Sequence, residues 1–247
     1  MSHGSDGDAI RATPVSPPNA TDDAPDAMEE ESSTQTRRRW VVSLLTLVIG
    51  ASVLAWSLRI PAGDPLFYPA TLLLAAAWIV GAWLSGPLPL GRHRDGRPGT
   101  GPLGAVVIGL ALLAVFLVGA VVVSQIPPLT APVQELLDHA RKGNLLVVAM
   151  ITAVNGLSEE LFFRGALFAA LPRRWQIAGT TVVYTIVTAM AGVPLLALAA
   201  LLLGVVVALQ RRATGGFLAP TVTHLVWSLG MLFLLGPTLD FAARLLG

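Results

Sequence analysis

An apolar run that begins near Leu145 ends on the sequence SEELFFRG, residues 158–165. It brings two adjacent carboxylates, Glu159 and Glu160, and the cation Arg164 into a hydrophobic segment of membrane length. Charged side chains in such segments are costly and usually serve a function, facing a bundle interior or a water-filled cavity. On a helix, Glu160 and Arg164 lie on one face because they are four residues apart. Glu159 lies about 100° further round the axis, so one carboxylate can pair with the arginine while the other is left for chemistry.

The composition is that of a membrane protein. Of the 247 residues, 54% are hydrophobic and only 13% are charged, whereas soluble domains carry about 25% charged residues. The sequence therefore predicts an all-α, polytopic bundle of about seven transmembrane spans, with a re-entrant pair as the alternative for the short fifth and sixth runs. The expected runs are roughly Trp40–Leu58, Pro65–Leu84, Leu103–Ser124, Leu145–Phe163, Ile177–Ala191, Leu195–Leu209 and Phe217–Leu235.

The polar N-terminal segment, residues 1–36, is expected to differ from the rest of the chain. It is rich in Pro, Ser, Thr and acidic residues, and such a segment buries too little apolar surface to fold. We predict a disordered, acidic, cytoplasmic tail at 1–36, N-terminal spans at 37–130 and a core at 131–247. The loop that contains Pro127 and Pro128 separates the last two.

The arginines predict the orientation of the chain in the cell membrane. With seven spans, four basic clusters fall on one side, which the positive-inside rule makes cytoplasmic together with the N-terminus. These clusters are Arg37–Arg39, the group Arg92, Arg94 and Arg97, the pair Arg173 and Arg174, and the pair Arg211 and Arg212.

His224 is the one histidine that the expected spans place at membrane depth. Glu160 lies near the inner end of the fourth run, and His224 is about two turns from the inner start of the seventh. A cavity open to the cytoplasm can hold both, with Ser228 one turn beyond His224. Taken alone, a histidine in a span also suits an interhelical hydrogen bond.

Together these residues resemble the CAAX protease and bacteriocin-processing family (CPBP, or Abi) of intramembrane proteases. Three helical motifs mark that family: Glu-Glu-x-x-x-Arg, Phe-x-x-x-His and His-x-x-x-Asn/Asp. The first is complete at Glu159, Glu160 and Arg164, and the third is partial, with His224 in place but Ser228 where Asn or Asp is expected. The resemblance covers roughly residues 140–235.

The second motif is where this sequence departs from the family. Its aromatic position is filled by Tyr184, but Thr188 stands where the family has histidine. Threonine cannot act as a base, although its hydroxyl can still position a water. No other histidine lies in the fifth or sixth run.

The resemblance implies a mechanism and a set of roles. A glutamate and the second-motif histidine activate a water that attacks a peptide carbonyl, and the third motif stabilises the oxyanion. Carried over to this chain, Glu159 is the general base, Glu160 and Arg164 form a structural pair, and His224 and Ser228 contact the oxyanion or the substrate. The choice of Glu159 over Glu160 as base comes from the family and not from spacing.

The leading hypothesis is an intramembrane endopeptidase, a hydrolase that cleaves a membrane-proximal peptide bond with glutamate-activated water. The alternative is a catalytically impaired member, because Thr188 replaces the histidine, which binds a peptide or partner helix or acts in immunity. A third reading, a proton relay through Glu159 and His224, would make the chain a small transporter.

The expected partners are the lipid bilayer and a peptide or membrane-protein substrate, with no nucleic acid. We expect no cofactor and no protein-bound divalent metal, because a catalytic zinc usually takes three protein ligands. Only His224 and the two glutamates are candidates, and Glu160 is expected to pair with Arg164. The absence of cysteine excludes thiolate ligands and disulfides.

Overall fold

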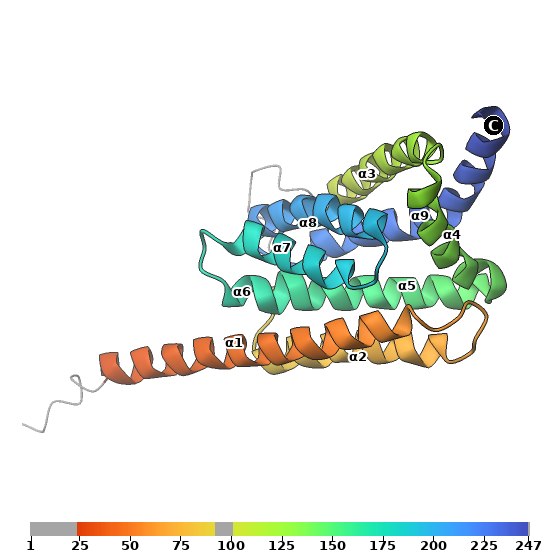
Figure 1. Ribbon diagram of the computed structural model, residues 1–247. Coiled ribbons are helices and arrows are strands. Elements are labelled where there is room, and N and C mark those ends of the chain that lie inside the picture. Colours follow the sequence, from red (N-terminus) through yellow and green to blue (C-terminus); the bar gives the residue numbers. More distant parts are fainter. Residues whose placement is uncertain (1–23, 92–100, 247) are drawn as a thin grey trace, which may run out of the picture. The chain divides into compact units, whose positions relative to one another are not determined.

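The computed structural model describes residues 24–91 and 101–246, and within these ranges the regular secondary structure is entirely helical (Figure 1). The expected all-α fold is confirmed. The elements in chain order are α1 Ala24–Ser57, α2 Phe67–Ser85, α3 Pro102–Val123, α4 Pro127–Lys142, α5 Leu145–Glu160, the π-helix η1 Leu161–Leu167, α6 Phe168–Ala170, α7 Gln176–Ala189, α8 Pro194–Thr214 and α9 Leu218–Leu246.

Six helices are long and apolar enough to cross a membrane: Ser33–Ser57, Phe67–Ser85, Pro102–Val123, Leu145–Ala170, Pro194–Thr214 and Leu218–Leu246. The apolar helix α7, Gln176–Ala189, is shorter than these. With α7 they follow the seven expected runs in order, so the chain is a multi-pass membrane protein. The sixth run is longer than expected, because α8 continues past Leu209 through Arg211 and Arg212 to end at a left-handed Gly215 (φ 70°). Glycine adopts this conformation without a steric penalty.

The N-terminal segment falls into two parts. Residues 1–23 of the expected tail, like the cluster of Arg92, Arg94 and Arg97, lie outside the described residues, whereas the chain from Ala24 onward is helical as the start of α1. Alanine, methionine and glutamate favour helix. Within the described residues, those up to Gln35 and those from Thr36 onward form two separate units. The domain boundaries and the cytoplasmic N-terminus stay predictions.

Helix α4 corrects the expectation of a loop after Pro127 and Pro128. The two prolines occupy the first turn of the helix, where their fixed φ and missing N–H are tolerated. Val133 and Leu137 are buried against Leu239 of α9, and the polar residues lie on other faces of α4. The segment is an amphipathic helix, and its polar residues hid it from a search for long apolar runs.

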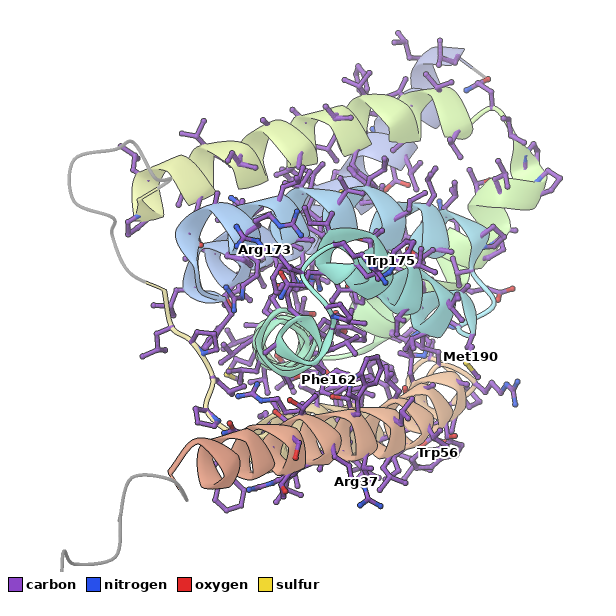
Figure 2. All side chains as sticks on the ribbon, turned by 90° about the vertical axis from the view of Figure 1, so that its left-hand side faces the viewer. Arg37, Trp56, Phe162, Arg173, Trp175 and Met190 are labelled. Carbon is purple, nitrogen blue, oxygen red and sulfur yellow. The ribbon has the colours of Figure 1, made fainter. Side chains whose placement is uncertain are left out.

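An aromatic cluster joins α2, η1 and α7 around the charged motif. Trp78 of α2 stacks on Phe162 at 4.9 Å between ring centroids and lies 5.2 Å from Phe163. Phe163 then meets Tyr184 of α7 edge to face at 4.9 Å. In Figure 2, Phe162 lies in the interior of the bundle, on a helix seen end-on. The motif is therefore placed by a dense apolar core.

Close packing of α3 against α9 predicts a sensitive position at Gly109. A Cβ there would lie 2.8 Å from the Val226 Cβ and 3.0 Å from the Thr223 carbonyl oxygen. We expect Gly109→Val to lower the free energy of unfolding by about 1–3 kcal/mol through overpacking, measured by thermal unfolding in lipid nanodiscs. Gly119→Ala on the same helix is the control, because nothing lies within 4 Å of its added Cβ. Equal midpoints for the two variants would contradict the packing argument.

Candidate active site

The charged motif lies where the α-helix changes to a π-helix. Asn144 caps α5 by accepting hydrogen bonds from the backbone N–H groups of Leu146 and Val147. The helix is regular as far as Glu160 and then continues as η1, which contains Arg164. Short π-helical segments are frequent at functional sites. Here the π-helix carries the arginine of the motif and is buried from Phe162 to Leu167.

The Glu160 carboxylate contacts two side chains, Arg164 and His224. Its Oε1 lies 3.2 Å from Arg164 Nη1 and 2.8 Å from His224 Nδ1. The side chains of Glu160 and Arg164 are fully buried, and that of His224 is 6% exposed. The expected pairing of Glu160 with Arg164 is therefore present, and His224 joins it from α9. Glu160 Oε2 has no hydrogen-bond partner within the described ranges.

Three groups on α7 and α8 contact Arg164. Its Nη2 donates to the Gly204 carbonyl of α8 at 3.4 Å, and its guanidinium lies 4.8 Å from the centroid of the Tyr184 ring on α7. Its own carbonyl accepts a 2.7 Å hydrogen bond from Arg211 Nε. The Arg211 guanidinium in turn lies 4.9 Å from the Phe168 ring centroid. The sequence places Arg211 only in a basic cluster beside the sixth run. In the structure it connects α8 to the π-helix.

Glu159 has a different environment from its neighbour. Its side chain is 20% exposed, compared with 0% for Glu160. Its Oε2 accepts a 2.7 Å hydrogen bond from the Tyr184 hydroxyl and lies 4.0 Å from His224 Nε2. Tyr184 is thus a site residue that sequence reasoning noted only as the aromatic of the second motif. The sequence did contain a signal for this role, because Tyr184 stands where the family motif has phenylalanine and adds a hydroxyl group.

Thr188 and Ser228 stand apart from this cluster. Thr188 is buried one turn after Tyr184 on α7. The Ser228 hydroxyl donates to the Leu225 carbonyl of its own helix at 3.4 Å, and Ser228 lines an apolar cavity. In the part of the chain that the structure describes, neither hydroxyl is hydrogen-bonded to Glu159, Glu160 or His224. The structure therefore brings together four of the six expected site residues and adds Tyr184. All catalytic roles stay predictions.

The possible metal ligands of the cluster support the prediction that no divalent metal is bound. Glu160 already contacts both Arg164 and His224, so a metal there would have to displace the arginine. Glu159 and His224 Nε2 then provide fewer ligands than a catalytic zinc usually takes from a protein. That the chain binds no divalent metal stays a prediction with this chemical support.

Comparison with known families gives a match to part of the chain. Residues 141–230 match the family described as type II CAAX prenyl endopeptidase Rce1-like. The resemblance to CAAX proteases is confirmed. This CAAX protease-like segment, residues 141–230, contains Glu159, Glu160, Arg164, Thr188 and His224. Comparisons with curated proteins and with solved structures give no match.

Removal of the arginine tests the buried network. Arg164→Met leaves the Glu160 carboxylate buried beside His224 without its permanent cation, and we expect a loss of about 3–5 kcal/mol of stability. Denaturation in mixed micelles with increasing dodecyl sulfate measures it.

The matched control for this prediction is Arg141→Met. Arg141 forms ion pairs with Asp138 and Asp240, but its side chain is 42% exposed, and exposed pairs are worth about 0–1 kcal/mol. Similar losses for the two variants would show that the Glu160 network is not a special contributor to stability.

Proposed function

We propose that the chain is an intramembrane endopeptidase in which Glu159 activates a water to cleave a membrane-proximal peptide bond. The observation that carries the proposal is the difference in burial and in partners between the two carboxylates. Glu160 is buried and bound by Arg164 and His224, while Glu159 is partly exposed and has one firm partner, Tyr184. A general base needs access to water and hydrogen-bond reach of the proton that it removes. Glu159 meets the first condition and Glu160 does not.

The proposed reaction uses the groups of the cluster in sequence. Glu159 removes a proton from a water, and the resulting hydroxide adds to the peptide carbonyl carbon to give a tetrahedral oxyanion. His224, fixed through Nδ1 by Glu160, points Nε2 toward the side of Glu159, and an N–H at Nε2 donates to the oxyanion. The C–N bond then breaks, and the proton held by Glu159 passes to the leaving amine.

Tyr184 supplies part of what the absent second-motif histidine would provide. Its hydroxyl holds Glu159 Oε2, which leaves the other carboxylate oxygen for the water. Thr188 follows one turn later on the same side of α7, so its hydroxyl is suited to position that water. The proposed site is therefore a glutamate oriented by a phenol and not a glutamate–histidine pair.

The test of the proposed function is cleavage of a peptide library by the full chain in nanodiscs. We expect Glu159→Gln to reduce cleavage by roughly 10²–10⁴-fold, the usual contribution of general acid–base assistance. Glu135→Gln, a change at an exposed carboxylate of α4, is the control and should cleave like the wild type. Undiminished cleavage by Glu159→Gln would rule out Glu159 as the base.

The second candidate function is that of an impaired family member that binds a peptide or partner helix. Thr188 favours it, because threonine is not a base and makes no hydrogen bond to Glu159 within the described residues. Thr188→His separates the two candidates. Wild-type cleavage that depends on Glu159 supports the endopeptidase, while cleavage seen only in Thr188→His identifies a decayed enzyme.

A Tyr184→Phe variant tests the orienting role of the phenol. A hydrogen bond to a charged group is worth about 1.5–3 kcal/mol, so we expect kcat to fall by about 10- to 100-fold with little change in KM. The protein has one other tyrosine, Tyr68, whose hydroxyl accepts from the Asn144 N–H away from the cluster. Tyr68→Phe is the control. An equal effect of both variants on kcat would point to a general loss of structure.

A further inference from the structure

We propose that Arg211 of α8 is a positioning residue for the proposed reaction. It fixes the π-helical register of η1 and thereby the place of the Arg164 side chain beside Glu160. The inference rests on the proposed function and adds to it a residue from outside the cluster of carboxylates and His224. Its starting point is the hydrogen bond from Arg211 Nε to the Arg164 carbonyl, at 2.7 Å.

The π-helix releases the carbonyl that Arg211 binds. In an α-helix the Phe168 N–H would donate to the Arg164 carbonyl, four residues earlier. Here the Phe168 N–H donates instead to the carbonyls of Phe163 and Gly165. The bond to Phe163 spans five residues, as π-helical bonds do, and the Arg164 carbonyl is passed over where η1 ends. Arg211 Nε takes the place of the missing helical donor.

Arg211 contacts both sides of the junction between η1 and α6. Its Nε reaches back to Arg164 in η1, and its guanidinium lies 4.9 Å from the ring centroid of Phe168, the first residue of α6. A return to the α-helical register would give the Arg164 carbonyl to the Phe168 N–H. Arg211 Nε would then lose its acceptor, and a buried donor without an acceptor is costly. Arg211 therefore favours the π-helical register over the α-helical one.

The burial of Arg211 indicates a more specific role than that of a cation at a helix end. Arg211 and Arg212 both lie in the last turn of α8, where the helix dipole favours cations. Arg212 is exposed, whereas Arg211 is only 8% exposed. A buried charge is expensive unless it is paired and hydrogen-bonded. Among the described residues, the ion pairs do not include Arg211, so its buried contacts are those at the junction.

The register of η1 bears on the reactive groups through Arg164. Because π-helical bonds span five residues instead of four, a turn of η1 holds more residues than an α-helical turn. The direction of the Arg164 side chain relative to Glu160, the last residue of α5, therefore depends on that register. Arg164 Nη1 lies 3.2 Å from Glu160 Oε1, and the same oxygen lies 2.8 Å from His224 Nδ1. A chain of contacts thus leads from Arg211 to the imidazole of the proposed site.

The first measurement reads this geometry without cleavage. The full chain is labelled with ¹⁵N-histidine, and the signal of His224 is identified after each of the other three histidines has been assigned by replacement with glutamine. Arg211→Met keeps a long side chain but removes the donor, and we expect the His224 Nδ1 signal to shift. Arg212→Met is the matched control, because Arg212 donates to a different carbonyl, that of Arg173, at 2.6 Å. An unmoved His224 signal in folded Arg211→Met would overturn the inference.

A double-mutant cycle tests whether Arg211 acts through Arg164. Arg164→Lys keeps a cation beside Glu160 but lacks the guanidinium. If Arg211 acts by placing that guanidinium, Arg211→Met should change the His224 signal and kcat much less in the Arg164→Lys background than in the wild type. Contacting residues commonly show such non-additivity. Equal effects in the two backgrounds would mean that Arg211 only supports the bundle, and the positioning role would be wrong.

The third measurement follows cleavage in nanodiscs. We expect Arg211→Met to lower kcat by about 10- to 100-fold, the usual size of a hydrogen bond that involves a charged group. KM should change little, because Arg211 is not proposed to touch the peptide. Arg211→Lys should recover part of the loss, since its ammonium can donate to the same carbonyl, and Arg212→Met should cleave like the wild type. An equal fall in kcat for Arg212→Met would contradict the inference.

These measurements separate a failure of the inference from a failure of the proposed function. A His224 signal that moves in Arg211→Met but not in Arg212→Met, with no wild-type cleavage, would remove the endopeptidase and keep Arg211 as the residue that sets the register. Cleavage that requires Glu159, together with wild-type kcat and an unmoved His224 signal in Arg211→Met, would keep the endopeptidase and remove the role of Arg211.

Discussion

The Glu160 carboxylate, shared by Arg164 and His224, is the constraint on which the rest of the bundle depends. Burying an ion pair costs several kcal/mol of desolvation for each ion, and only good geometry and further hydrogen bonds offset that cost. The bundle supplies both, through the Gly204 carbonyl that accepts from Arg164 and the Tyr184 ring beneath its guanidinium. The network joins α5, η1, α7, α8 and α9, so these helices cannot shift independently of one another.

Because Glu160 is bound in this network, its neighbour Glu159 can have a separate role. Adjacent residues on a helix point about 100° apart, so Glu159 leaves the ion network and reaches partly exposed space. Tyr184 serves both carboxylates, with its ring against Arg164 and its hydroxyl on Glu159. One side chain of α7 thus couples the buried structural pair to the carboxylate that the proposed reaction uses.

Helix α9 carries residues of both the charged cluster and the apolar cavity. His224 faces the carboxylates, while Trp227 and Ser228 face the apolar cavity. The match of residues 141–230 to the CAAX protease family is consistent with a peptide substrate. Of the two second-motif positions on α7, it is Tyr184 and not Thr188 that hydrogen-bonds Glu159 within the described residues.

The sequence by itself determined the all-helical membrane fold, the order of the apolar helices and the pairing of Glu160 with Arg164. Each depends on local properties: hydrophobic length, and spacing along one helix. It missed α4, because short amphipathic helices resemble polar loops when long apolar runs are sought. Only the tertiary structure decided that Tyr184 meets Glu159, that Arg211 binds the Arg164 carbonyl and that Ser228 faces a cavity. Periodicity specifies which residues share a face, whereas the rotation of each helix against its neighbours is set by packing of the whole bundle.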